Sequence, residues 1–120
     1  MTHKTGSDLI NEASARIREV SAVAVKAMME RGEPAVYLDV REPNEYNLGH
    51  LPGALHIPRG YLELRVESAV PRDATVVAYC SAGMRSALAT DTLQQLGYAN
   101  AVSLAGGWRE WMMADGPVEG

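Results

Sequence analysis

Short apolar runs alternate along the chain with segments whose hydrophobic positions recur every three to four residues. The clearest run, 75–79, is rich in β-branched and aromatic residues, as expected for a strand covered on both faces. Four further runs predict strands at 16–20, 35–40, 54–57 and 100–104. The intervening segments predict helices at 22–31, 43–48, 60–70, 84–96 and 108–114. Strands that alternate with helices favour an α/β fold of three layers, α/β/α, with a central, mainly parallel five-stranded sheet.

The hydrophobic positions of these helices also predict which residues face the sheet. Ser21 is expected to cap the helix at 22–31, and Gly32 follows its end. The residues expected to face the core or to give apolar cover are Val25, Met28, Met29, Tyr61, Leu62, Leu64, Val66 and Trp111.

We expect one domain at 16–115, preceded by an N-terminal extension at 1–15 and followed by a C-terminal tail at 116–120. In the extension, Ser7 and Asp8 are candidate caps for a short helix through Ala15, and a partly ordered tail is the alternative. The tail at the other end is expected to be loose.

Composition narrows the classes of function. The 120 residues carry a net charge of −4 without a basic run, which argues against nucleic-acid binding. No apolar run approaches the ~20 residues that span a membrane, and no apolar segment follows Lys4 as in a secretory signal. We therefore expect a cytoplasmic protein that acts on neither membranes nor nucleic acids.

The chain has one cysteine, which excludes an internal disulfide and leaves no cysteine cluster for a metal. We expect no metal and no cofactor. A covalent adduct on this cysteine would have to be resolved by a nucleophile from outside the chain.

Cys80 lies where the central strand ends and the helix at 84–96 begins. Backbone N–H groups of a loop before a helix form a cradle for anions, and the helix adds partial positive charge. Such a position favours the thiolate form of a cysteine, and Arg85 adds a full positive charge nearby. A single cysteine is more often a buried hydrophobe, but ligands bind beyond the carboxyl ends of parallel strands, where Cys80 is expected.

Other polar residues follow neighbouring strands. Asp39 and Arg41 at the end of the strand 35–40 are expected to fix the next turn, with direct substrate contact as the alternative. His50, between Gly49 and Leu51-Pro52, is a candidate general acid or base, but it more often holds such a turn by hydrogen bonds. His56 is interpreted in the same way, and Ala105-Gly106-Gly107 is expected to be a flexible turn.

These motifs, taken in order, resemble a single-domain rhodanese, a sulfurtransferase of the rhodanese-homology family. The resemblance covers about 35–111. The segments that carry it are Leu38-Asp39-Val40-Arg41, Glu45, Gly49-His50-Leu51-Pro52-Gly53-Ala54, Ile57-Pro58, Cys80-Ser81-Ala82-Gly83-Met84-Arg85-Ser86, Gly97-Tyr98, Leu104-Ala105-Gly106-Gly107 and Trp111.

The resemblance implies a rhodanese-like domain at 16–115 and a thiosulfate sulfurtransferase that works through a persulfide on Cys80. Thiosulfate or a similar small anionic sulfur donor would lose sulfite, and cyanide or a thiol, in some cases on a protein, would accept the sulfur. The amides of the loop would stabilise the anionic sulfur, and Arg85 would hold the sulfonate end. The residues implied to bind substrate are Ser81, Ala82, Gly83, Met84, Arg85 and Ser86, and those implied to brace the site are Asp39, Arg41, Glu45 and His50.

Four other functions are alternatives to a thiosulfate sulfurtransferase. Related cell-cycle phosphatases share the fold but have five residues between cysteine and arginine, whereas four, Ser81 to Met84, separate Cys80 from Arg85. The shorter loop also argues against an arsenate reductase. A rhodanese-like binding or regulatory module commonly lacks the cysteine. A protein-to-protein sulfur relay would share the persulfide and differ only in its partners.

Overall fold

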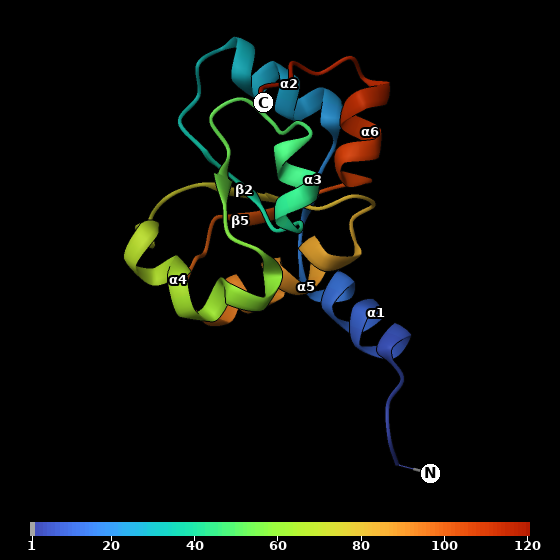
Figure 1. The fold of residues 1–120 in the computed structure, drawn as a ribbon. Coiled ribbons are helices and arrows are strands. Elements are labelled where there is room, and N and C mark those ends of the chain that lie inside the picture. The colour runs from blue at the N-terminus through green and yellow to red at the C-terminus, as the bar shows by residue number, and fades with distance from the viewer. Residues whose placement is uncertain (1) are drawn as a thin grey trace.

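The computed structural model describes residues 2–120 (Figure 1) and confirms the predicted five-stranded sheet. Its strand order is β1-β5-β4-β2-β3, and every pair of neighbouring strands is parallel. The strands are β1 (Glu19–Val20), β2 (Val36–Asp39), β3 (Leu55–His56), β4 (Val76–Tyr79) and β5 (Ala101–Leu104). The strand that leads to Cys80, β4, is therefore the central one.

Helices cover both faces of this sheet, as the alternating pattern predicted. In the view of Figure 1, α2, α3 and α6 lie above the strands, and α4 and α5 lie below them. The helices are α1 (Gly6–Arg16), α2 (Ala22–Glu30), α3 (Pro43–Asn47), α4 (Leu62–Ala69), α5 (Met84–Gln95) and α6 (Gly107–Met113), and a 3₁₀ turn, η1 (Arg59–Tyr61), precedes α4.

The alternation of side chains along β4 divides the core into two halves. Val76, Ala78 and Cys80 belong to the cluster that also contains Leu62 of α4 and Leu93 of α5. The two intervening residues, Val77 and Tyr79, belong to the opposite cluster. That cluster also contains Val25 of α2 and Trp111 of α6. Cys80 therefore lies on the same side of the sheet as α5, the helix that begins just after it.

The predicted face of α4 is only half right. Leu62 and Val66 are fully buried, whereas Tyr61 is 47% exposed and Leu64 is 80% exposed. The reason is that the α-helix begins only at Leu62, after η1. Residues four apart then share the inward face, and Leu64 falls on the opposite one.

The N-terminal segment forms a helix, but its predicted cap is wrong. Thr5 is the N-cap of α1: its hydroxyl accepts from the amide of Asp8 at 3.1 Å, and the Asp8 carboxylate accepts from the amide of Thr5. Ser7 lies inside the first turn. The Arg16 guanidinium at the other end of α1 donates two hydrogen bonds to Asp91 of α5, at 2.9 and 2.8 Å. Since α1 ends at Arg16, it extends across the predicted boundary at 15/16.

The C-terminal residues are not loose, contrary to expectation. His50 and Glu119 form an isolated antiparallel bridge in which each amide donates to the other's carbonyl at 2.9 Å. The Trp111 indole donates to the carbonyl of Pro117, and a Cβ on Gly116 would collide with the same ring. These contacts hold the last residues against the turn at 49–53.

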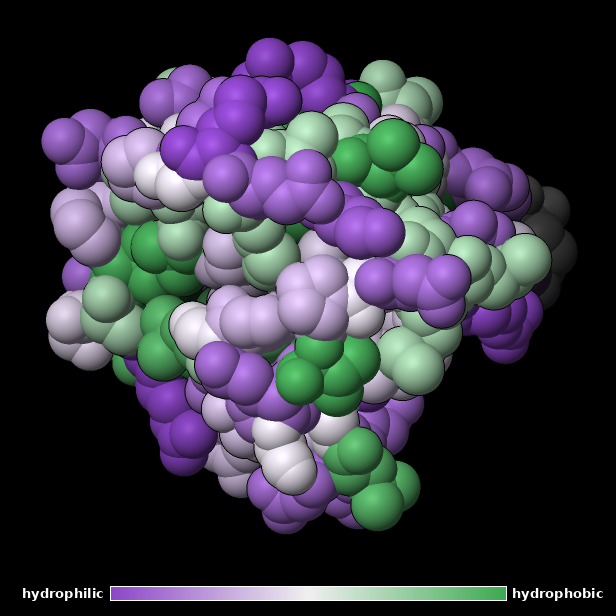
Figure 2. Space-filling view, turned by 90° about the horizontal axis from the view of Figure 1, so that it is seen from above, coloured by the Kyte–Doolittle hydropathy of each residue, from purple (hydrophilic) through white to green (hydrophobic). Residues whose placement is uncertain are grey.

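Seen from above, the side of α2, α3 and α6, the molecule has hydrophobic residues in small separate clusters among hydrophilic ones (Figure 2). Val23 of α2 and Met113 of α6 are among the exposed hydrophobic side chains of the protein. Within residues 2–120 no helix has the length and apolar character that crossing a membrane requires.

Candidate active site

The Cys80 side chain is enclosed by the loop that follows β4. Its Sγ atom accepts hydrogen bonds from the backbone amides of Gly83, at 3.1 Å, and Ser86, at 3.3 Å. The residue is only 1% exposed. Cys80 thus packs among the hydrophobic residues of one core cluster, but its sulfur has two backbone amides as polar partners. Such amides stabilise negative charge.

The start of α5 provides this environment. Gly83, the N-cap, has φ 104°, in the left-handed region that glycine adopts readily. The first amides of a helix have no partner inside the helix, so they are free to point at an anion. Ser86, in the first turn, is fully buried and lies between Sγ, 3.6 Å from its hydroxyl, and the hydroxyl of Ser103, at 2.9 Å. Ser103, in β5, was not singled out from the sequence.

The N-terminus of α6 holds the other side of the loop. The amides of Trp108 and Arg109 donate to the carbonyls of Cys80, at 2.7 Å, and Ser81, at 3.1 Å. Gly106 and Gly107 have φ values of 71° and 57°, and Gly107 lies directly against the Cys80 carbonyl. The turn at 105–107, which was predicted to be flexible, is therefore fixed, because the start of α6 is hydrogen-bonded to the loop. The paired glycines were the signal in the sequence for this close approach.

Arg85 is joined to Glu45 and Ser81. Its guanidinium donates to both carboxylate oxygens of Glu45, at 2.8 and 3.1 Å, and to the Ser81 hydroxyl at 2.9 Å. Ser81 in turn donates to Glu45 at 2.6 Å. The hydrogen bonds from Arg85 lower the pKa of Glu45 to about 2 from its ordinary 4.5, against the opposing effect of partial burial. Glu45 is thus ionised near neutral pH and balances the charge of Arg85.

A second ion pair, fully buried, lies beneath the end of β2. The Arg41 side chain donates to both oxygens of Asp39, the shortest contact being 2.7 Å, and also to the carbonyl of Gly49. The Tyr79 hydroxyl donates to Asp39 at 2.8 Å and accepts from the amide of Leu51. Burial, together with the charge of Asp39, raises the pKa of Tyr79. This network joins β2, β4 and the turn after α3, and it pairs the Asp39 carboxylate with the Arg41 guanidinium within the fold.

Both histidines named above lie beside Tyr46 of α3. The His50 ring stacks on Tyr46 with centroids 3.8 Å apart, and its Nδ1 lies 3.0 Å from the Tyr46 carbonyl. The His56 ring stacks on the same tyrosine at 4.5 Å and contacts the Arg41 carbonyl through Nε2. The ring nitrogens named here are thus engaged with the backbone of the turns.

The structure brings only some of the predicted loop residues to the Cys80 sulfur. Gly83 and Ser86 contact Sγ directly, and Arg85 is turned toward Glu45. Ala82, Gly83 and Met84 line a cleft whose other lining residues come from α1 and β1, namely Ser7, Ile10, Asn11, Ser14 and Glu19. Within residues 2–120 no group of three metal-ligating side chains could hold a metal ion.

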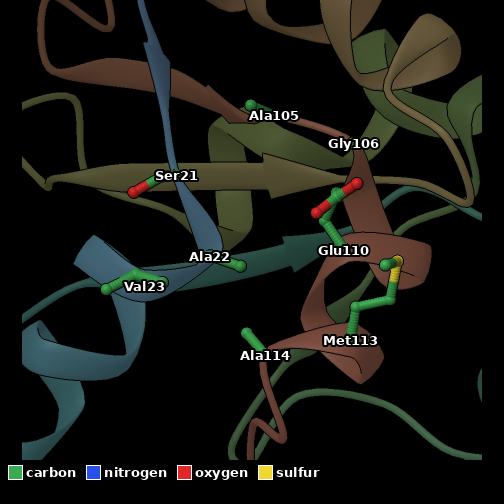
Figure 3. Close-up of a pocket in the computed structure, with 8 residues that line it drawn as sticks. All are labelled: Ser21, Ala22, Val23, Ala105, Gly106, Glu110, Met113 and Ala114. Atoms are coloured by element: carbon green, nitrogen blue, oxygen red, sulfur yellow. The ribbon is translucent and has the colours of Figure 1, made fainter.

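A second hollow lies between α2 and α6 (Figure 3). Ser21, Ala22 and Val23 lie on one side of it, and Glu110, Met113 and Ala114 lie on the other. Among the lining residues Glu110 is the only one of an acidic or basic type. The hollow therefore lacks a nucleophile of the kind found at Cys80.

Comparisons with known proteins identify the family of this chain. The family model of the rhodanese-like domain matches residues 21–114. The chain is 32% identical over 108 residues to a putative sulfur carrier protein of Bacillus subtilis, and 38% identical over 78 residues to a thiosulfate sulfurtransferase of Escherichia coli. These matches cover 90% and 64% of this chain, and 58% and 74% of the two relatives.

One solved structure resembles the chain over nearly its full length. It is a Rhodopseudomonas palustris protein of unknown function described as a possible tyrosine phosphatase. The two are 30% identical with a TM-score of 0.89, and the match covers 99% of this chain and 97% of the other. Because the family model spans most of the chain and the fold agrees with it, the chain belongs to the rhodanese-like domain family.

Proposed function

We propose that this protein is a sulfurtransferase that carries sulfane sulfur as a persulfide on Cys80. Thiosulfate or a similar donor supplies the sulfur, and cyanide or a thiol removes it. The observation that carries the proposal is the position of Sγ between the amides of Gly83 and Ser86, at the carboxyl end of the central strand.

In the first step the Cys80 thiolate attacks the outer sulfur of thiosulfate. The new Cys80 S–S bond forms as the S–S bond of thiosulfate breaks, and sulfite leaves with the electron pair of that bond. The charge of −3 on the reactants is preserved by the persulfide anion and sulfite together. Loop amides that already point at the sulfur stabilise this charge without reorganisation.

In the second step cyanide attacks the terminal sulfur of the persulfide. Thiocyanate forms, and the electron pair of the S–S bond returns to Cys80 as the thiolate. A thiol acceptor would follow the same course and leave as a persulfide. Since the chain has one cysteine, the sulfur must pass to another molecule.

Burial of the nucleophile favours a donor with a terminal sulfur atom. A residue that is 1% exposed admits one atom of a substrate more readily than a whole tetrahedral group. Ser86, which lies 3.6 Å from Sγ, and the amide of Gly83 leave little room for the oxygens of a phosphate.

Phosphatase activity is the second candidate, because a structural neighbour of high similarity is described as a possible tyrosine phosphatase. Two features of this chain argue against it: the loop has four residues between Cys80 and Arg85, and Arg85 pairs with Glu45. A sulfur relay between proteins remains a variant of the first proposal, since one relative is named a sulfur carrier. We also propose a cytoplasmic location, where a reducing medium would keep Cys80 free.

A steady-state assay tests the proposal. Purified protein with thiosulfate and cyanide should release thiocyanate, and Cys80→Ser should release none above background. The same preparations should leave p-nitrophenyl phosphate intact. Rapid hydrolysis of the phosphate ester together with absent thiocyanate would favour the phosphatase, whereas neither activity would favour a binding module.

A further inference from the structure

The charge of Arg85, the cation nearest to Cys80 along the loop, is already neutralised before a substrate arrives. Glu45 uses both carboxylate oxygens on its guanidinium, and Ser81 closes a triangle of hydrogen bonds between them. The side chains of Arg85 and Glu45 are 37% and 27% exposed, so the pair lies at the border of the site rather than in the core. An anionic donor must therefore compete with a carboxylate for this arginine.

We infer that Glu45 is a specificity-determining residue that disfavours doubly charged sulfur donors and favours donors of lower negative charge. It acts through Arg85, which makes it a positioning residue rather than a catalytic one. The inference rests on the proposed function and names the substrate class for the same site.

The charges on neighbouring elements support this inference. Arg41 forms a buried ion pair with Asp39, in which both side chains lie inside the fold. Arg109 approaches the loop through its backbone amide, while the residue is exposed to solvent. On the acidic side, Glu19 lines the cleft beside Ala82–Met84. With Glu45 ionised, the charge of Arg85, the cation within the Cys80 loop, is compensated before a dianion arrives.

Two small donors separate the effect of charge from the effect of sulfur chemistry. Thiosulfate is a dianion, and methanethiosulfonate is a monoanion that presents the same kind of terminal sulfur. In each case Cys80 receives one sulfur atom, and sulfite or methanesulfinate leaves with the electron pair. The two donors differ by one unit of charge, and the effect of their different leaving groups cancels when the donor ratio is compared between variants.

The size of the effect follows from the Coulomb energy of one unit charge. An uncompensated arginine about 6 Å from the donor, in water-like surroundings, raises the affinity for the donor roughly threefold for each negative charge that the donor carries. Glu45→Gln should therefore raise kcat/KM about tenfold for thiosulfate and about threefold for methanethiosulfonate. The ratio between the two donors changes about threefold in favour of thiosulfate.

The experiment measures kcat/KM for both donors, with cyanide as acceptor, in the wild type, Glu45→Gln and Glu63→Gln. Glu63 of α4 pairs with Arg59 of η1 at 3.0 Å, so its variant makes the same change in net charge at an Arg–Glu pair outside the loop. The inference predicts a shifted donor ratio in Glu45→Gln only. An unchanged ratio in Glu45→Gln, or an equal shift in Glu63→Gln, would overturn it.

A salt titration of the wild type provides a second measurement that needs no variant. If Glu45 neutralises Arg85, kcat/KM should fall with salt no more steeply for thiosulfate than for methanethiosulfonate. A much steeper fall for thiosulfate would overturn the inference. Failure of the proposed function looks different, because neither donor would then transfer sulfur to the wild type at all.

Discussion

Gly107 lies against the backbone of Cys80 so closely that a Cβ atom at position 107 would be 2.3 Å from the Cys80 carbonyl oxygen. The contact allows the next amide, that of Trp108, to donate to that oxygen at 2.7 Å. The end of β4 and the start of α6 are therefore fixed to each other. The position of the candidate nucleophile depends on a helix that begins 27 residues after it in the chain, from 80 to 107.

Gly107→Ala should displace the Cys80 loop. We expect a loss of about 1–3 kcal/mol of stability and a fall in sulfur transfer of roughly tenfold or more, since the added methyl must move backbone atoms. Gly32→Ala is the matched control, because Gly32 has a similar φ of 70° with nothing within 4 Å of a Cβ. Equal effects of the two variants on thiocyanate release would show that the contact with Cys80 is unimportant.

The buried pair of Asp39 and Arg41 should be among the most sensitive sites for stability. Asp39→Ala leaves the Arg41 guanidinium buried without its carboxylate, which should cost about 3–5 kcal/mol in urea unfolding or prevent folding. Glu63→Ala, which breaks a surface pair, should cost at most about 1 kcal/mol. A loss for Asp39→Ala as small as that for Glu63→Ala would contradict the account of this network.

Much of the fold followed from local patterns. The apolar run before Cys80, the caps Ser21 and Gly32, and the alternation of strands with helices all depend on residues close in sequence, and the structure confirms the elements that they predicted. The inward face of α4 was harder to predict, because it depends on the residue at which the α-helix begins, which is Leu62 after η1. The order of strands in the sheet depends on packing between distant segments and has no local signal.

Local sequence likewise predicted only part of the surroundings of Cys80. Gly83 and Ser86 follow Cys80 closely in the chain, so their contact with the sulfur was predictable from spacing. The partners that fix the loop are distant: Glu45 comes from α3, Ser103 from β5, and Gly107 from α6. The resemblance named Glu45 as a brace of the fold, but only three-dimensional contacts reveal that it neutralises Arg85.

Acid should weaken the wild type more than Glu45→Gln. The pKa of Glu45 is lowered to about 2 in the fold, so its pairing with Arg85 stabilises fully above about pH 4.5 and is lost as pH falls toward 2. After discounting for solvent screening, we expect this contribution to be about 1–2 kcal/mol at neutral pH. Urea unfolding at pH 7, 4 and 3 should show the difference between the two proteins shrinking with acidification. A growing difference would contradict the assignment.

The attachment of α1 should also depend on pH. Hydrogen bonds from Arg16 lower the pKa of Asp91, so this attachment is complete above the ordinary value of 3.8 and weakens as pH falls below it. Amide hydrogen exchange in α1, corrected for intrinsic rates, should show protection that decreases between pH 6 and 3. Asp91→Asn should have low protection throughout. Equal protection in both proteins would mean that other contacts hold the helix.

The most direct test of the central claim is the intact mass of the protein after incubation with thiosulfate and removal of small molecules. The account predicts a gain of one sulfur atom in the wild type, no gain in Cys80→Ser, and return to the starting mass with release of thiocyanate when cyanide is added. A wild-type mass that stays unchanged with thiosulfate and with methanethiosulfonate would contradict it.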